Sequence, residues 1–221
     1  MIKRLLSYII PIKIYEKTSK ISKTLEVSWN NGKLVLDSKN TNYSYGSLQK
    51  VLRKGLITIG FDKVRKMNEI LVLGVAGGSV IKTLVEEIHF EGNILGVEID
   101  ENSIAIANQY FGLNQIKNYA THIGDAQEFV TKTTKKYDLI IIDIFEDTEM
   151  PSFLFRKKFV DSCKQLLNKN GFILFNTMIL DEKQIDRNSV FIKQFDSKNY
   201  YTKTLSKVEY YNQLIILEKL N

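Results

Sequence analysis

Apolar runs alternate with mixed polar stretches over the last two thirds of the chain. The run at 70–73 leads into a glycine-rich segment at 74–79, and the runs at 95–97 and 139–142 each end at an acidic residue. Continuous apolar runs of this kind are typical of parallel strands that are covered on both faces. The pattern therefore predicts an α/β fold in which helices connect the strands of an open, doubly wound sheet.

The order of elements follows from the same pattern. We expect parallel strands at 69–74, 93–99, 120–123, 137–143 and 172–175. We expect helices at 45–61, 80–88, 102–110, 153–167 and 182–195, with the turn residues at 169–171 closing the fourth of them. The segments at 200–205 and 210–217 are too close together for a crossover helix, so they predict an antiparallel hairpin. Five parallel strands and such a hairpin describe the class I methyltransferase-like (Rossmann-like) sheet.

The first part of the chain has a different rhythm. Residues 25–29 alternate between apolar and polar, Asn30-Asn31-Gly32 is a strong turn signal, and residues 34–36 can pair back. We therefore predict a small β-hairpin region at 1–44, followed by a Rossmann-like domain at 45–221.

One glycine and one acidic residue carry the main chemical signal. Gly74 ends the first parallel strand, and Glu98 ends the second, 24 positions later. In nucleoside-binding sheets the glycines let the backbone approach the ligand, and an acid ~20 residues on binds the ribose hydroxyls. The spacing predicts a nucleoside-bearing cofactor.

Composition narrows the class of protein. The chain has 221 residues, of which 44% are hydrophobic and 25% charged, and a formal net charge of +6. Its lysines are spread along the chain, which favours a solvated surface over a nucleic-acid interface. No apolar stretch approaches the ~18 residues of a membrane span, and Pro11 and Lys13 interrupt the apolar start, so we expect no signal peptide. With two histidines and Cys163 as the single cysteine, we expect no histidine- or cysteine-based metal site. Without a membrane span or a signal peptide, a cytoplasmic protein is the default expectation. The composition leaves open whether the chain forms a homodimer.

Four segments together resemble one family. They are residues 73–79, 97–100, 124–129 and 137–143. In order and spacing they are similar to the spermidine synthases (polyamine aminopropyltransferases), and more so to spermidine-synthase-like proteins of less certain substrate. The resemblance covers roughly residues 25 to 178.

The resemblance implies a role for particular residues. Glu98 would hold the ribose hydroxyls, Asp125 would accept a hydrogen bond from the adenine amino group, and Asp143 would accept the proton of the attacking amine. The cofactor-binding set it implies is Gly74, Ala76, Gly77, Gly78, Glu98, Asp125 and Ala126. For the acceptor substrate it points to Tyr45, Gln49 and Glu146.

Two departures from the family pattern matter for the reaction. Family members carry an aspartate inside the glycine loop, which meets the free amine of decarboxylated adenosylmethionine; this chain has Ala76 there. A lost hydrogen bond to a charged amine costs roughly 1.5–3 kcal/mol, and Ala76 leaves room for the carboxylate of ordinary adenosylmethionine. After the fourth strand, the segment 143–147 has apolar residues between its acids, with Pro151 delayed.

The residues leave three hypotheses, in this order. The first is an adenosylmethionine-dependent methyltransferase acting on an amine of a small molecule or protein. The second is an aminopropyltransferase that makes a polyamine from decarboxylated adenosylmethionine. The third is a nucleoside-binding subunit without turnover.

Overall fold

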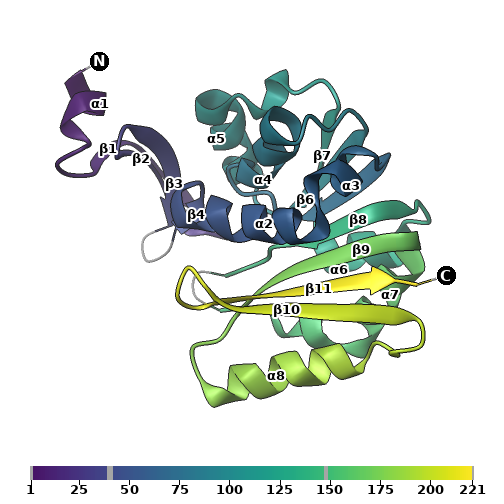
Figure 1. The fold of residues 1–221 in the computed structure, drawn as a ribbon. Coiled ribbons are helices and arrows are strands. Elements are labelled where there is room, and N and C mark those ends of the chain that lie inside the picture. Colours follow the sequence, from purple (N-terminus) through teal and green to yellow (C-terminus); the bar gives the residue numbers. More distant parts are fainter. Residues whose placement is uncertain (1, 39–41, 147–148, 221) are drawn as a thin grey trace.

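Two sheets of different size organise the molecule. The structure, a computed structural model, describes residues 2–38, 42–146 and 149–220. The larger sheet has seven strands in the order β10-β11-β9-β8-β5-β6-β7. Figure 1 shows this sheet with helices on both sides and the smaller sheet at one edge. The predicted fold class is confirmed.

The large sheet has the predicted directions. Strands β5 to β9 pair in parallel, β11 runs antiparallel to β9, and β10 completes the hairpin at the edge. The seven strands are β5 (Glu69–Leu73), β6 (Asn93–Glu98), β7 (Tyr119–Ile123), β8 (Tyr137–Ile142), β9 (Leu167–Met178), β10 (Tyr200–Val208) and β11 (Asn212–Lys219).

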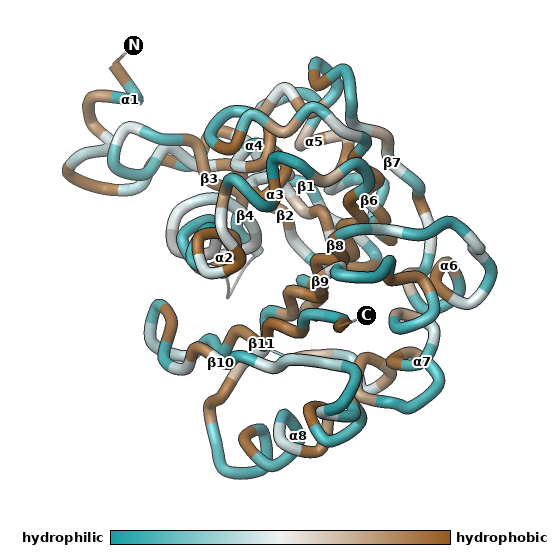
Figure 2. The backbone as a smooth tube through the Cα atoms, turned by 45° about the vertical axis from the view of Figure 1, so that its right-hand side comes forward, coloured by the Kyte–Doolittle hydropathy of each residue, from teal (hydrophilic) through white to brown (hydrophobic). Residues whose placement is uncertain are grey.

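Each face of the sheet is covered by its own set of helices. The first set is α2 (Gly46–Ile59), α3 (Phe61–Arg65), α4 (Ser79–Lys82), the π-helical turn Thr83–Glu87, α5 (Glu101–Phe111) and the 3-10 turn Leu113–Gln115; the second is α6 (Ala126–Lys132), the 3-10 turn Ser152–Phe155, α7 (Lys157–Leu166) and α8 (Glu182–Lys193). Because side chains alternate along a strand, Leu139 and Ile141 of β8 enter the core under the first set, whereas Ile140 and Ile142 enter the other. Figure 2 shows the resulting hydrophobic strands at the centre of the molecule.

The small sheet contains more than the predicted hairpin. Its strands are β1 (Ile12–Ser19), β2 (Lys23–Asn30), β3 (Lys33–Ser38) and β4 (Asn42–Ser44), all antiparallel, and a short helix α1 (Ile2–Leu6) precedes them. Leu25, Val27 and Leu36 pack against Ile106 and Phe111 of α5. The small sheet is therefore docked on the larger unit, and the division at residue 44 stays a prediction.

Two local predictions were wrong. The single helix expected at 153–167 is a 3-10 turn and α7, which the extended residue Arg156 separates. Residues 169–171 do not close a helix but lie inside β9, which begins at Leu167 directly after α7. Between the Tyr137–Leu167 and Leu139–Phe172 pairs, β9 advances five residues while β8 advances two. Asn170 takes a positive φ of 57° there. The turn-forming residues are accommodated as an irregularity within the strand.

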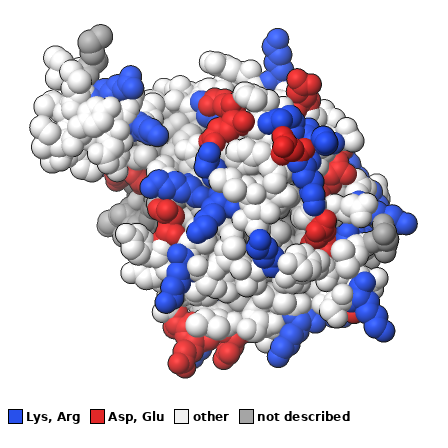
Figure 3. All heavy atoms as spheres, viewed as in Figure 1, with Lys and Arg blue, Asp and Glu red and all other residues white. Residues whose placement is uncertain are grey.

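Charged side chains of both signs are interspersed over the face of the molecule seen in Figure 3. Within the described ranges, no helix combines the length and apolarity that a membrane crossing requires. In the same part of the chain, no three His, Cys, Asp or Glu side chains are grouped to hold a metal ion.

Candidate functional site

Glu98 and the glycine loop meet where β5 and β6 end. The Oε2 atom of Glu98 accepts hydrogen bonds from the backbone N–H groups of Val75 and Ala76, both at 3.0 Å. Its Oε1 atom accepts from the N–H of Asp100, also at 3.0 Å. Because a carboxylate offers about four lone-pair sites, Glu98 can hold the loop and still accept from a ligand hydroxyl. Glu98 thus lies next to the glycine loop, as predicted. That Glu98 binds ribose hydroxyls stays a prediction.

The glycines of the loop allow other parts of the protein to approach it. A Cβ atom on Gly74, whose φ is +86°, would lie 2.1 Å from the carbonyl oxygen of Asp143. A Cβ atom on Gly77 would lie 2.8 Å from Cβ of Ser44. The end of β8 and the end of β4 are therefore packed directly on the loop. This geometry leaves the backbone of the loop, rather than its side chains, to line a ligand.

Asp143 is the acid that lies beside this loop. Its N–H donates to the carbonyl of Leu73 at 2.8 Å, and its Oδ1 atom accepts from Nδ2 of Asn176, also at 2.8 Å. Burial raises the pKa of Asp143 to about 6, against the hydrogen bond from Asn176, and the negative charge of Glu98 raises that pKa further. An aspartate with such a pKa can take up a proton near neutral pH.

The two carboxylates lack a basic partner. Among the residues that the structure describes, neither Glu98 nor Asp143 forms an ion pair with a lysine, an arginine or a histidine. A cation placed near both acids would favour their charged forms. The charge of the site therefore suits a sulfonium ion or a protonated amine.

Tyr45 lies against the glycine loop from the side of α2. Its hydroxyl donates to the carbonyl of Gly77 at 3.0 Å, and its ring stacks on that of Phe111, with centroids 4.4 Å apart. Burial raises the pKa of the Tyr45 phenol. Of the predicted acceptor residues, Tyr45 is the one that contacts the loop.

The other two acceptor candidates have different surroundings. The side-chain amide of Gln49 donates to Oγ1 of Thr83 at 3.3 Å, which ties it to the π-helical turn. Glu146 is exposed, and its backbone pairs with that of Glu149. Asp147, which follows in the altered segment, lies outside the described residues. No contact of Gln49 or Glu146 with Asp143 is seen in the described structure.

Asp125 begins α6 beside the end of β6. Its Oδ1 atom accepts from the N–H of Glu128 at 2.8 Å, so it caps the helix. The preceding residue, Gly124, donates its N–H to the carbonyl of Glu98 at 2.9 Å. Ala126 is buried in the core behind α6. Adenine contact by Asp125 stays a prediction, because the cap alone accounts for its observed bond.

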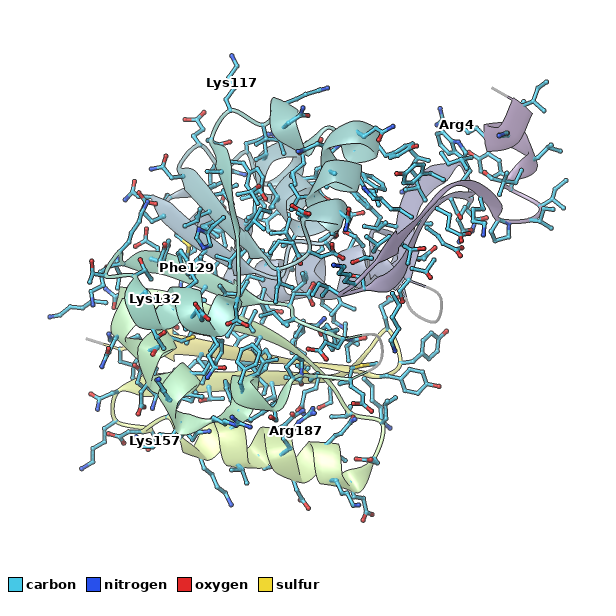
Figure 4. All side chains as sticks on the ribbon, turned by 180° about the vertical axis from the view of Figure 1, so that it is seen from behind. Arg4, Lys117, Phe129, Lys132, Lys157 and Arg187 are labelled. Atoms are coloured by element: carbon cyan, nitrogen blue, oxygen red, sulfur yellow. The ribbon has the colours of Figure 1, made fainter. Side chains whose placement is uncertain are left out.

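A cavity of about 470 Å³ opens beside Asp125. Its lining is His122, Ile123, Gly124, Asp125, Glu128, Phe129, Lys132 and Thr133. Figure 4 shows Phe129 and Lys132 on α6. Of the candidate site residues the lining contains Asp125, but not Glu98, Asp143 or the loop at 74–79.

Two contacts of the site were not predicted from the sequence. The hydroxyls of Ser19, which ends β1, and Ser22, in the turn before β2, both donate to Oδ2 of the buried Asp100. Asn212 of β11 donates to Asn176, the partner of Asp143. No local pattern signals either contact, because each joins segments that are brought together only by the packing of strands.

Comparison with known proteins supports the resemblance. The family model described as "Spermine/spermidine synthase domain" matches residues 30–218. A polyamine aminopropyltransferase of Vibrio vulnificus is 32% identical over 140 residues, which are 60% of this chain and 46% of that protein. The chain thus matches about half the length of this curated relative.

Solved structures support the fold. A probable spermidine synthase from Corynebacterium glutamicum is similar with a TM-score of 0.74 and 14% identity, covering 94% of this chain and 79% of that one. Human methyltransferase-like protein 13 in complex with SAH gives a TM-score of 0.62 at 21% identity, covering 80% and 83% of the two chains. At these identities the likeness concerns the fold alone, and this fold occurs both in the probable spermidine synthase and in the methyltransferase-like protein.

Proposed function

The chain belongs to the spermine/spermidine synthase domain family, and from this we propose that it is an aminopropyltransferase. It takes decarboxylated adenosylmethionine as donor and a diamine or polyamine as acceptor. The observation that carries the proposal is the pair Glu98 and Asp143, which flank the glycine loop without a basic partner in the described structure.

Both substrates bring positive charge to these acids. The donor carries a sulfonium ion and an ammonium group, and the acceptor is a protonated amine in solution. In the proposed arrangement, Glu98 binds the ribose hydroxyls of the donor and Asp143 faces the acceptor nitrogen. Binding of cations next to the two carboxylates offsets the repulsion that raises the pKa of Asp143.

The reaction is an in-line displacement. Asp143 takes a proton from the acceptor ammonium, and the freed nitrogen lone pair attacks the propyl carbon bonded to sulfur. A C–N bond forms, the C–S bond breaks, and its electron pair stays on sulfur, giving neutral methylthioadenosine. The product leaves as a secondary ammonium ion, and Asp143 gives the proton that it took to water. Since a neutral thioether leaves without help from an acid, the protein mainly aligns the reactants and moves one proton.

The proposal is tested by product analysis. Purified protein is incubated with decarboxylated adenosylmethionine and a panel of α,ω-diamines, and the products are identified by liquid chromatography and mass spectrometry. We expect methylthioadenosine and an aminopropylated amine in equal amounts, and neither with Asp143→Asn. Binding of the nucleoside without either product would instead favour a non-catalytic subunit.

Methyl transfer is the second candidate, and one observation favours it. The loop at 74–79 contains no acidic side chain that could meet the amine of the decarboxylated donor. The same incubation with ordinary adenosylmethionine distinguishes the two reactions, because methyl transfer would yield adenosylhomocysteine and a methylated amine. Adenosylhomocysteine formation in place of methylthioadenosine would overturn the aminopropyl proposal.

A further inference from the structure

Three polar side chains form a row across three adjacent strands of the large sheet. Asp143 follows β8, Asn176 lies in β9, and Asn212 begins β11, the strand beyond β9. Nδ2 of Asn212 donates to Oδ1 of Asn176 at 2.9 Å, and Nδ2 of Asn176 donates to Oδ1 of Asp143 at 2.8 Å. The two bonds point in the same direction, toward the carboxylate.

The row lies on the face of the sheet that carries the glycine loop and α2. Leu174 and Leu214 belong to the core under α2, and Asn176 and Asn212 are each two positions from one of them. Side chains two positions apart on a strand share a face. Asn176 is fully buried at 0% exposure, so its amide depends on protein partners for its hydrogen bonds.

Asn212 fixes which end of the Asn176 amide faces Asp143. An asparagine side chain has one carbonyl oxygen and one NH₂ group, and its flat amide can turn to exchange them. Because the NH₂ group of Asn212 occupies the oxygen of Asn176, the NH₂ group of Asn176 is directed at Asp143. In the reversed orientation, the amide oxygen of Asn176 would face Oδ1 of Asp143, and its NH₂ group would face the NH₂ group of Asn212.

This arrangement assigns different tasks to the two oxygens of Asp143. We propose that Asn212 is a positioning residue for the reaction: through Asn176 it holds Oδ1 of Asp143, which leaves Oδ2 to accept the proton of the acceptor amine. The proposal rests on the proposed function, since it concerns the same base.

The row also sets the protonation state of the base. Among the described residues, the charged group that acts on Asp143 is Glu98, which together with burial favours the protonated acid. The donated bond from Asn176 favours the charged carboxylate and lowers the pKa of Asp143. Without the bond, Asp143 is ionised in a smaller share of the molecules at neutral pH, so fewer molecules have a carboxylate that can act as a base.

The test is the pH profile of kcat/KM for aminopropyl transfer in four proteins. They are the wild type, Asn176→Leu, Asn212→Ala and the double variant, with Tyr211→Ser as control because Tyr211 adjoins Asn212 and is 58% exposed. The hydrogen bond from Asn176 favours the charged form of Asp143, so Asn176→Leu should move the acidic limb of the profile upward by about one to two pH units. Asn212→Ala should move it in the same direction by less. The control should leave it in place.

The double variant distinguishes a relay from two separate effects. If Asn212 acts through Asn176, the double variant has the limb of Asn176→Leu alone. An unmoved limb in Asn212→Ala, or a double variant whose shift is the sum of both, would overturn the proposal.

A readout independent of turnover keeps the two proposals apart. The pKa of Asp143 can be followed by ¹³C NMR of its carboxyl carbon in the same variants without any substrate. We expect the same order of upward shifts there. If that order appears but no donor gives product, the proposed function fails and the relay stands; if the carboxyl pKa is the same in all variants, the relay fails.

Discussion

The α-carbon of Gly74 and the carbonyl oxygen of Asp143 are so close that a Cβ atom on Gly74 would lie 2.1 Å from that oxygen. The contact joins the end of β5 to the end of β8, next to the hydrogen bond from Asp143 N–H to Leu73 O. The site therefore depends on a glycine for a reason other than ligand access. Gly74 lets the residue proposed as base lie against the loop proposed to hold the donor.

Gly74→Ala should accordingly damage both stability and binding. A non-glycine residue at positive φ costs about 1–2 kcal/mol, and the overlap with Asp143 adds an overpacking cost of about 1–3 kcal/mol. We expect a loss of about 2–5 kcal/mol in the free energy of unfolding, measured by urea denaturation, with weaker nucleoside binding. Gly112→Ala is the control, because Gly112 has a φ of +66° but its Cβ would meet only the flexible end of Gln115, at 3.4 Å. Equal losses in both variants would refute the close contact.

Asp143→Asn should stabilise the protein above about pH 4, and the gain should be complete above pH 6. Burial raises the pKa of Asp143 to about 6 in the folded state, against about 3.9 in an unfolded chain. The folded state thus binds the proton more tightly, so its stability relative to an asparagine variant falls as pH rises from about 4 to 6. We expect the free energy of unfolding of Asp143→Asn to exceed that of the wild type by up to about 3 kcal/mol at pH 7.5, and to equal it below pH 4. Thermal denaturation across this range measures it, with the exposed Asp186→Asn as control. A gain that persists at pH 3.5 would contradict this explanation.

The turn between β1 and β2 should stabilise the loop that follows Glu98. Burial alone would raise the pKa of Asp100, but bonds from the hydroxyls of Ser19 and Ser22, together with the N–H of Asn102, outweigh it and lower the pKa. A group with a lowered pKa stabilises the fold at neutral pH, and that contribution is lost as pH falls through its titration.

Replacing both serines by alanine removes two donors from a buried carboxylate, each worth roughly 1.5–3 kcal/mol. We expect a loss of stability at pH 7 that shrinks at pH 3, together with weaker nucleoside binding, since the N–H of Asp100 also holds Glu98. The control is Thr18→Ala, because Thr18 lies in β1 next to Ser19 and is exposed. A deficit of the same size at both pH values would show that the hydroxyls do not act on the charge of Asp100.

The sequence predicted the part of the site that follows from the topology of a parallel sheet. Gly74 and Asp143 each come directly after a strand, Glu98 is the last residue of one, and the carboxyl ends of parallel strands share one edge. Their proximity therefore required only the identification of the strands. The same reasoning predicted the terminal hairpin, whose short connection excluded a crossover helix.

The remaining contacts depend on pairings that no local pattern fixes. Ser19 and Asp100 are separated by 81 positions, and they meet only because the small sheet docks on α5. Asn212 reaches Asn176 because β11 inserts between β9 and β10. The error at 169–171 has a different cause. These residues keep a turn-like conformation, with Asn170 at a φ of 57°, but they form an irregularity between the paired strand residues Leu167 and Phe172 instead of ending a helix.

The central claim, that Glu98 and Asp143 receive a cationic donor, is tested most directly by calorimetry with two matched nucleosides. Decarboxylated adenosylmethionine and decarboxylated adenosylhomocysteine differ only in one methyl group and the sulfonium charge. We predict that the wild-type protein binds the sulfonium nucleoside at least about tenfold more tightly above pH 7, which corresponds to ~1.4 kcal/mol. This preference should fall below pH 6, because Asp143 becomes protonated. In Asp143→Asn the preference should be reduced at all pH values. Equal affinities for the two nucleosides, or a preference unaffected by pH and by the substitution, would contradict the claim.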